Sequence, residues 1–198
     1  MDSVVSVPFV DSIPLSDEAL MRRYAGGDAK SFEILYLRHE MRVWRYLERN
    51  VRNAATADEL MQEVWFSVAR EAARYQPSAR FSTWLFTIAH NRMVDSMRSS
   101  RPQVSLEALG DGDRAADQMI DDPQHGPHAG ALAFQQAQAL NRAVEALPLE
   151  QREAFLLHAE GDLTVDEIAA VTVCSFETAK SRLRYARTKL RELLKEYL

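Results

Sequence analysis

A segment near the C-terminus carries side chains suited to reading duplex DNA. The sequence TVDEIAAVTVCSFETAKSRLRYARTKL reads as a short helix, a short turn and a longer basic helix from about residue 176. That order is the plan of a helix-turn-helix, whose second helix enters the major groove with its N-terminal half. The side chains expected to meet base edges or phosphates are Glu177, Thr178, Lys180, Ser181, Arg182, Arg184 and Arg187. The alternative is a solvated basic helix that closes a bundle.

A second segment, residues 75–101, interleaves aromatic and basic side chains in YQPSARFSTWLFTIAHNRMVDSMRSSR. Such a surface can hold single-stranded nucleic acid, because bases stack on the rings and arginines follow the phosphates. Helical spacing nevertheless places Trp84 and Phe86 in the core when they are taken alone. The polar loop 74–80 and the side chains of Asn91, Arg92 and Arg98 remain candidates for either a binding or a solvated surface.

A third segment, ADELMQEVWFSV, places acidic and polar side chains on one face of a predicted helix. Asp58, Glu59, Gln62 and Glu63 share that face. Glu59 and Glu63 form a like-charge pair four residues apart, which disfavours an isolated helix. A surface that accepts this repulsion indicates docking against a basic partner. A solvated face near a helix N-terminus, where acidic residues are favourable, explains the pattern equally well.

Four helices with short connections are predicted to carry the aromatic and acidic segments. Ser16 is expected to cap the first helix, with acidic residues in its first turn. Thr56 and Glu59 form a capping-box pattern that would open the helix bearing the acidic face. A further helix is expected over 82–99. These elements predict a compact helical domain over residues 16–101, preceded by a tail over residues 1–15.

The rest of the chain is predicted to form an acidic linker and a second helical domain. Residues 102–135 contain six acidic side chains and one basic one, among glycines and prolines, which favours a flexible connection. In residues 136–198, Pro148 suits a first helical turn, and Thr164 with Glu167 forms another capping box. The apolar residues of the last helix, Ala179, Leu183, Ala186, Leu190 and Leu193, recur at helical spacing.

Composition agrees with an all-α fold of two small helical domains. The 198 residues include 7 glycines and 7 prolines, too few for the many turns of a β-sandwich or barrel. The single cysteine, Cys174, excludes an intrachain disulfide and makes a zinc site improbable. His39, His90 and His158 are expected at helix surfaces or boundaries. The sequence has no catalytic motif, metal site or cofactor site that we recognise, so an enzyme is not predicted.

The charge distribution predicts a protein that binds DNA poorly alone and needs a partner in order to bind it. The formal net charge is −5, which repels DNA, yet residues 177–191 carry six basic side chains and one acidic one. No apolar run approaches the length of a membrane span, and the N-terminus lacks the pattern of a signal peptide. We therefore expect a cytoplasmic protein.

The order of these segments resembles the extracytoplasmic-function class of bacterial sigma factors. The similarity extends over about residues 16–101 and 136–198, from DELMQEVW and FSTWLFTIAHNRMVDSMR to ALPLEQREAFLLHAEGDLTVDEIAA and ETAKSRLRYARTKL. It implies that core RNA polymerase and promoter DNA are partners, and that an anti-sigma factor is a further one. The acidic linker would thread the RNA-exit side of the polymerase, a basic channel that its charge suits.

The resemblance also implies a role for each surface. Asp58, Glu59, Gln62 and Glu63 match the contact with the clamp helices of the largest polymerase subunit. The loop that captures a flipped base of the minus-ten element matches Tyr75, Gln76, Ser78, Arg80 and Ser82. The upstream edge of that element and its backbone match Asn91, Arg92, Asp95 and Arg98. The helix from Phe176 to Lys189 matches the reader of the minus-thirty-five element.

One departure from the family pattern concerns the turn of the helix-turn-helix. Many relatives have glycine where this chain has Val173. Because a β-branched residue is strained at positive φ, we expect the turn to take another shape.

The sequence thus predicts a promoter-specificity subunit that binds core polymerase, recognises two promoter elements and assists melting. One rival is an autonomous dimeric helix-turn-helix repressor, although no dimerisation seam is evident. Another is a helical adaptor or sigma mimic that sequesters a regulator without touching promoters.

Overall fold

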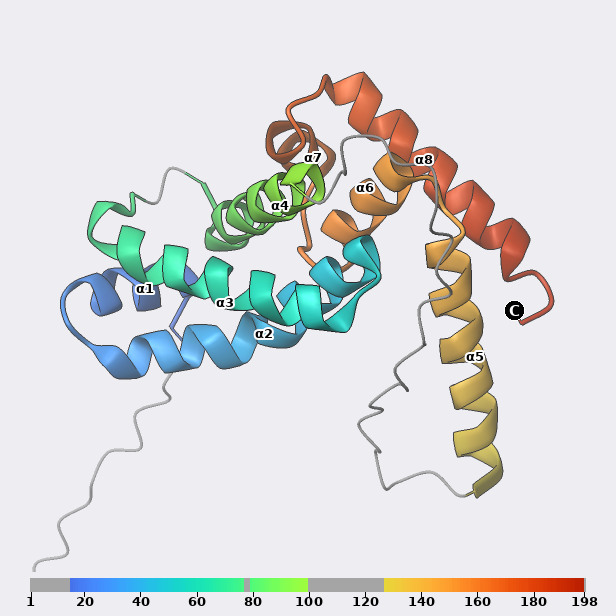
Figure 1. Cartoon of the computed structure of the whole chain (residues 1–198), viewed down its shortest axis with the longest axis horizontal. Helices are drawn as coiled ribbons and strands as arrows, with labels where there is room; N and C mark the ends of the chain where they lie inside the picture. The colour runs from blue at the N-terminus through green and yellow to red at the C-terminus, as the bar shows by residue number, and fades with distance from the viewer. Residues whose placement is uncertain (1–14, 77–78, 100–126, 198) are drawn as a thin grey trace, which may run out of the picture.

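A computed structural model of the chain describes residues 15–76, 79–99 and 127–197, and the regular elements in these ranges are all helical. The first group comprises α1 (Asp17–Ala25), α2 (Ala29–Val51), α3 (Ala54–Glu71), the single-turn 3-10 helix η1 (Ala72–Arg74) and α4 (Phe81–Ser99) (Figure 1). The second group comprises α5 (Pro127–Glu145), α6 (Leu149–Ala159), α7 (Val165–Val171) and α8 (Phe176–Leu193). The predicted all-α class is confirmed. Among the described helices, none is both long enough and apolar enough to cross a membrane.

The predicted linker over 102–135 lies mostly outside the described residues, as does nearly all of the predicted tail. Its last part, residues 127–135, belongs to α5, so the helix begins earlier than expected. Pro127 is the first residue of α5, where its fixed φ and missing N–H suit a helix start.

Side-chain caps start two of the helices as predicted. The Ser16 Oγ accepts a hydrogen bond from the N–H of Ala19 at 3.2 Å, at the N-terminus of α1. Thr164 and Glu167 form the reciprocal capping box of α7. Each cap satisfies backbone N–H groups that have no partner inside the helix.

The start of α3 differs from the prediction. The Asn53 Oδ1 accepts from the N–H of Thr56 at 3.0 Å, so the helix begins at Ala54 and Thr56 lies in its first turn. The expected capping box of Thr56 and Glu59 is therefore wrong, because an asparagine three residues earlier takes the capping position.

Two acidic residues of α1 tie that helix to α2 and α4. The Glu18 carboxylate accepts from the N–H of Phe81 at 2.8 Å, which lowers the pKa of Glu18 and supplies a partner for the first turn of α4. Asp17 lies 2.7 Å from both Arg38 and His39. Burial opposes ionisation of Asp17, but these hydrogen bonds lower its pKa on balance. His39 is 4% exposed, so its expected position at a helix surface or boundary is wrong; the hydrogen bond with Asp17 makes its burial possible.

The second group packs around the buried face of α8. Ala179, Leu183, Ala186 and Leu190 are buried there, as their spacing predicts, whereas Leu193 is exposed. This face packs against α5, α6 and α7, and α8 therefore runs along the outside of the molecule (Figure 1).

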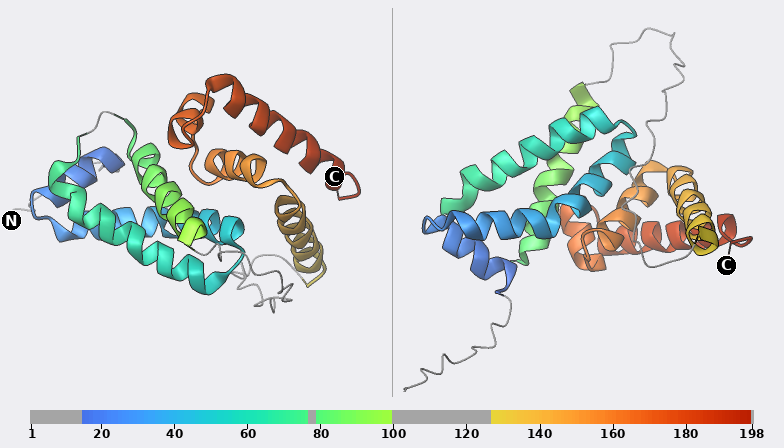
Figure 2. Two further views of the ribbon diagram at one scale, coloured as in Figure 1. Left: turned by 45° about the horizontal axis from the view of Figure 1, so that its top comes forward. Right: turned by 90° about the horizontal axis from the view of Figure 1, so that it is seen from below.

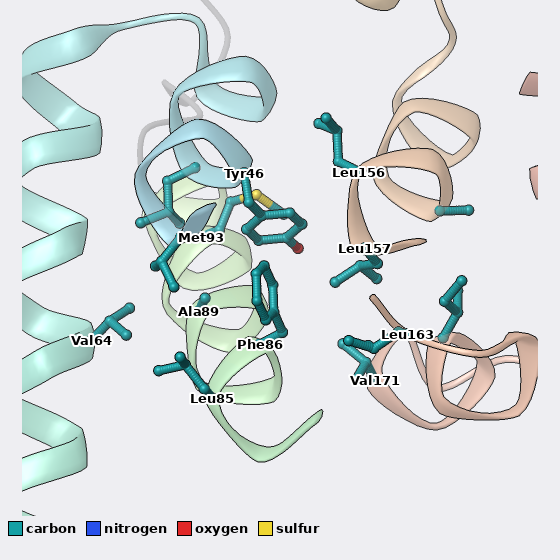
Figure 3. Packing of buried hydrophobic residues seen from close by; sticks show 14 of the residues in the cluster. Tyr46, Val64, Leu85, Phe86, Ala89, Met93, Leu156, Leu157, Leu163 and Val171 are labelled. Atoms are coloured by element: carbon teal, nitrogen blue, oxygen red, sulfur yellow. The ribbon is translucent and has the colours of Figure 1, made fainter. Parts of the chain in front are cut away.

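The two groups of helices share one continuous apolar core. Tyr46 from α2 and Phe86 from α4 meet edge to face at 5.4 Å, and they point toward Leu157 and Leu163 of the second group (Figure 3). A side chain at Gly161 would place its Cβ 2.6 Å from the Leu157 carbonyl oxygen and 3.3 Å from Phe86, so glycine permits this approach. The left view of Figure 2 shows α4 between α3 and α7, and α4 contacts both.

Candidate nucleic-acid and partner-binding surfaces

The helix-turn-helix consists of α7, α8 and the turn between them. The Ala169 carbonyl oxygen accepts from the N–H of Cys174 at 3.0 Å, which closes the turn onto α7. The Ser175 Oγ accepts from the N–H of Thr178 at 3.1 Å and starts α8. Backbone and capping bonds on both sides of the turn therefore fix the direction of α8.

The outward face of α8 is polar and basic. Ser181 and Arg182 are half-buried, and the other predicted reader side chains are exposed, namely Phe176, Glu177, Thr178, Lys180, Arg184 and Arg187. Lys180 lies 3.7 Å from Glu177 and 5.6 Å from the ring centre of Phe176. These contacts are weak and solvated, so the ammonium group is available to a phosphate.

Arg187 of α8 has a hydrogen-bond acceptor on another helix, α6. Its guanidinium lies 2.7 Å from the Nε2 of His158. The Nδ1 of that ring lies 3.0 Å from the Leu163 carbonyl oxygen, which can only accept. Nδ1 therefore carries the proton and Nε2 accepts from Arg187, which ties α8 to α6.

The turn contains one residue with a left-handed backbone conformation, and that residue is Val173. Val173 has φ of 50° and is 89% exposed. The expectation that the turn takes another shape is wrong, because the bond from Cys174 to Ala169 and the cap at Ser175 hold the backbone around it. The left-handed conformation costs an L-residue about 1–2 kcal/mol.

Replacing Val173 with glycine is expected to raise the free energy of unfolding by up to about 1 kcal/mol. Glycine removes the left-handed strain, and this gain exceeds the larger chain entropy that glycine has in the unfolded state. Little packing is lost, because the side chain is exposed. Urea denaturation would measure the change. Val173→Ala is the control, since alanine keeps a Cβ; a glycine variant no more stable than the alanine variant would contradict the assignment of strain.

A groove runs between the C-terminal part of α3 and α4. It consists of two hollows of about 810 and 310 Å³ that share Glu71 and Trp84. The larger hollow is also lined by Arg70, Ala73, Arg74, Tyr75 and Gln76. The smaller one is also lined by Ser67, Thr87, Ile88, Asn91, Arg92 and Asp95. Aromatic, basic and acidic side chains thus line one concave surface.

The groove brings together part of the predicted minus-ten surface, namely Tyr75, Gln76, Asn91, Arg92 and Asp95. Arg98 is exposed and lies 3.9 Å from Asp95. Ser82 is 8% exposed and faces the core, which corrects the expectation that it contacts DNA. Ser78 lies outside the described residues.

Trp84 contributes to the groove more than its spacing predicted. It is half-buried, packs against Tyr75 and Phe81 with ring centres 5.0 and 5.8 Å apart, and lines both hollows. Phe86 is fully buried, as predicted. Burial, together with the nearby charge of Glu18, raises the pKa of Tyr75, so its phenol stays neutral.

Three charged side chains of the groove were not singled out from the sequence. Arg70 and Glu71 lie in the last turn of α3, before the predicted loop over 74–80, and Arg74 of η1 is the first residue of that loop. Their nearness to Tyr75 in the sequence is the signal that would have found them.

The predicted acidic face lies on the outer side of α3. Asp58, Glu59, Gln62 and Glu63 are all exposed there. The Asp58 carboxylate accepts a hydrogen bond from the Trp44 indole at 2.8 Å, which ties this end of the face to α2. Phe66, one turn beyond Gln62, is 74% exposed. This apolar side chain was not predicted as part of the face, although its spacing in the sequence places it there.

One predicted DNA contact, Arg80, is held by the second group of helices. Its guanidinium lies 2.9 Å from the Asp162 carbonyl oxygen, 3.1 Å from the Asp162 carboxylate and 3.6 Å from the carboxylate of Glu167. Thr83 also donates to Glu167. Burial opposes ionisation of Glu167, but the bonds from Thr83 and Thr164 lower its pKa on balance.

A buried carboxylate of Glu160 also joins the two groups of helices. Glu160 is 7% exposed and accepts from Arg45 at 2.9–3.1 Å and from Arg49 at 3.1 Å, both on α2. Arg49 also donates to Asn141 of α5 at 3.0 Å. Two guanidinium groups compensate the burial of one carboxylate.

Glu153 forms a second buried junction between the groups. It accepts from the Tyr46 hydroxyl at 3.2 Å and lies 2.5 Å from the Nδ1 of His90. Burial and the charge of Glu153 raise the pKa of Tyr46 well above its ordinary value. His90 therefore lies between two groups of helices, a boundary position as expected.

Family profiles match both groups of helices. The profile of Sigma-70 region 2 matches residues 35–103, and that of Sigma-70, region 4 matches residues 137–190. The first range contains the acidic face and the groove, and the second contains the helix-turn-helix.

Known proteins resemble the chain over most of its length. RNA polymerase sigma factor CarQ of Myxococcus xanthus is 34% identical over 176 residues, covering 89% of this chain and 96% of the relative. ECF RNA polymerase sigma factor RpoE of Cereibacter sphaeroides is 34% identical over 167 residues, covering 83% of this chain and 87% of the relative. ECF RNA polymerase sigma factor SigK of Mycobacterium tuberculosis is 31% identical over 182 residues, covering 89% of this chain and 92% of the relative.

Solved structures share the fold. CnrH in complex with the cytosolic domain of CnrY has a TM-score of 0.61 at 22% identity and covers 91% of this chain and 97% of its own. RpoE of Bartonella quintana in complex with the anti-sigma factor NepR has a TM-score of 0.60 at 23% identity, and the match covers 84% of this chain and 98% of RpoE. From the two matched regions in order and from relatives that match nearly end to end, the chain belongs to the sigma-70 family of RNA polymerase sigma factors, in its extracytoplasmic-function group.

Proposed function

We propose that this protein directs core RNA polymerase to promoters by binding two promoter elements through two different surfaces. One observation carries the proposal. The chain combines a helix suited to the major groove of duplex DNA with a groove suited to single-stranded DNA. The exposed face of α8 offers a helix of major-groove dimensions, with Lys180 and Arg184 in solvent. This surface is proposed to bind the minus-thirty-five element.

The groove between α3 and α4 is proposed to hold the melted minus-ten element. Trp84 and Tyr75 supply aromatic surface, and Arg70, Arg74 and Arg92 supply positive charge along the same hollows. A base stacked on such a ring gains about 1–3 kcal/mol, and arginines hold the backbone between bases. Bases must leave the duplex to reach these rings, so binding here favours melting.

The outer face of α3 is proposed to dock on core polymerase. Glu59 and Glu63 supply negative charge, and Phe66 supplies an exposed apolar side chain beside them. A charged face around one aromatic anchor is typical of protein interfaces. The proposed domains follow from these assignments: residues 16–101 carry the polymerase and minus-ten surfaces, and residues 136–198 carry the minus-thirty-five surface.

We also propose that an anti-sigma factor regulates the protein in the cytoplasm. RpoE of Bartonella quintana forms a complex with the anti-sigma factor NepR, and this chain shares its fold. A partner that covers the acidic face or the groove would compete with polymerase or promoter.

In vitro transcription with core polymerase on genomic fragments tests the proposal. Start sites that share two upstream sequence blocks are the expected result. Palindromic operator binding without polymerase would instead indicate a repressor. Binding to core enzyme without any run-off product would indicate an adaptor.

Substituting alanine for Arg74 and Gln76 is expected to impair melting more than initial promoter binding. Both side chains line the larger hollow, where loss of contacts to the unstacked strand is expected to reduce thymine reactivity about tenfold. Permanganate footprinting of holoenzyme complexes measures the melted region. Tyr75 is left intact because it packs on Trp84. Lys30→Ala, which removes an exposed cation on α2, is the charge control; equal thymine reactivity in the two variants would refute the assignment.

A further inference from the structure

Glu71 occupies the junction of the two hollows. It lines both of them together with Trp84, and its side chain is 43% exposed. Its nearest cation is Arg70 at 3.5 Å, an adjacent residue whose side chain is 68% exposed. Among the described residues, no hydrogen bond to the Glu71 carboxylate is found. Its oxygens are therefore free to accept hydrogen bonds from a ligand in the groove.

The position of Glu71 is unfavourable for the protein alone. It is the last residue of α3, where the partial negative charge of the helix C-terminus disfavours a carboxylate. It also precedes η1, but its side chain forms no capping hydrogen bond there. Neither the stability of α3 nor the start of η1 accounts for this side chain.

Glu71 is equally unfavourable for binding a nucleic-acid backbone. The arginines that line the same hollows attract phosphates, and a carboxylate among them repels phosphates. A residue that opposes both local stability and backbone binding is expected where a specific contact compensates for it.

The contact that a carboxylate can make here is defined by its chemistry. An ionised carboxylate only accepts hydrogen bonds, so it pairs with the exocyclic amine of a base and is repelled by a carbonyl oxygen at the same position. Trp84, beside Glu71 in both hollows, offers a ring on which that base can stack.

We propose that Glu71 determines base specificity in the groove by accepting a hydrogen bond from the exocyclic amine of an unstacked base held against Trp84. Cytosine is therefore favoured over uracil or thymine at this position, because the amine at C4 is replaced by a carbonyl oxygen. The proposal rests on the proposed function, since it requires that the groove hold single-stranded DNA.

Single-stranded oligodeoxycytidine and oligodeoxyuridine of equal length test this proposal, because the two bases differ only in the amine or carbonyl oxygen at C4 and in the proton that uracil carries at the adjacent N3. The full chain is titrated with each fluorescent oligomer at low salt, where phosphate contacts are strong. The wild-type protein is expected to bind oligodeoxycytidine about tenfold more tightly. In Glu71→Gln, whose amide both donates and accepts, the preference is expected to fall below about threefold, and binding to oligodeoxyuridine is expected to strengthen.

Two controls separate base reading from net charge and from folding. Glu33→Gln removes the same charge from an exposed position on α2 and should keep the wild-type preference. The melting temperature of Glu71→Gln should equal or exceed that of the wild type, because an unfavourable charge at the end of α3 is removed. A wild-type protein without preference, or a Glu71→Gln variant with the wild-type preference, would overturn the assignment of Glu71 alone. Failure to bind either oligomer, together with absent run-off transcription, would overturn the proposed function as well.

Discussion

Reversing Glu59 and Glu63 to arginine is expected to lower the affinity for core RNA polymerase by at least about a hundredfold. Both side chains are exposed on the outer face of α3, which is proposed to dock on a basic surface of the polymerase. Like charges placed together at an interface cost several kcal/mol, and each 1.4 kcal/mol is about tenfold in affinity. Asp58 is left unchanged because it accepts a hydrogen bond from Trp44.

The fold should survive this reversal. One like-charge pair four residues apart is exchanged for another, so the helix loses no favourable pair. Pull-down with core enzyme and circular dichroism would be compared with a variant in which alanine replaces Lys180 and Arg184. That control should keep polymerase binding and lose promoter affinity. The slope of the logarithm of the promoter-binding constant against the logarithm of salt concentration should be smaller in magnitude by about 0.9 for each lost phosphate contact. A folded reversal variant with wild-type affinity for core enzyme would refute the docking face.

Replacing Glu160 with glutamine is expected to lower the free energy of unfolding by about 2–3 kcal/mol and to loosen the packing of the two groups of helices. The substitution leaves Arg45 and Arg49 without their charged partner at a buried position. The cost lies below that of a fully buried pair because the Arg45 side chain is 37% exposed. Urea denaturation and the radius of gyration from small-angle X-ray scattering measure the two effects.

Glu150→Gln is the matched control for Glu160→Gln. It removes an exposed carboxylate from α6, the helix that Glu160 follows, and should lower the free energy of unfolding by less than about 1 kcal/mol, through the helix dipole, without a change in size. A double-mutant cycle with Arg49→Ala isolates the coupling between α2 and α6. If the Glu160 variant keeps the wild-type radius of gyration and stability, the carboxylate does not hold the groups together.

The helices and the outward faces were predictable because local patterns determine them. The apolar spacing of α8 and the caps at Ser16 and Thr164 depend on residues close in sequence. The α3 start was missed where two capping candidates competed, since Asn53 and Thr56 are three residues apart. Val173 shows that a turn can keep a strained conformation when hydrogen bonds on both sides hold it.

The contacts between the two groups of helices could not be predicted from the sequence. Glu160 and Arg45 are 115 residues apart, and Glu153 and Tyr46 are 107 apart. Charged residues on amphipathic helices are usually solvated, so their pattern alone does not indicate burial. Only the folded chain shows that Glu160, just past the end of α6, meets the arginines of α2.

If Arg80 contacts promoter DNA as predicted from the sequence, its ion pairs with Asp162 and Glu167 couple the packing of the two groups of helices to promoter binding. One guanidinium cannot bind these carboxylates and a DNA phosphate at the same time. In that case the apparent dissociation constant for the promoter would equal the intrinsic one divided by the fraction of molecules in which Arg80 is released. If about one molecule in a hundred is open, apparent affinity falls about a hundredfold. A ligand that binds the open form more tightly than the closed form would then increase the affinity for the promoter. Promoter DNA would increase the affinity for that ligand by the same factor.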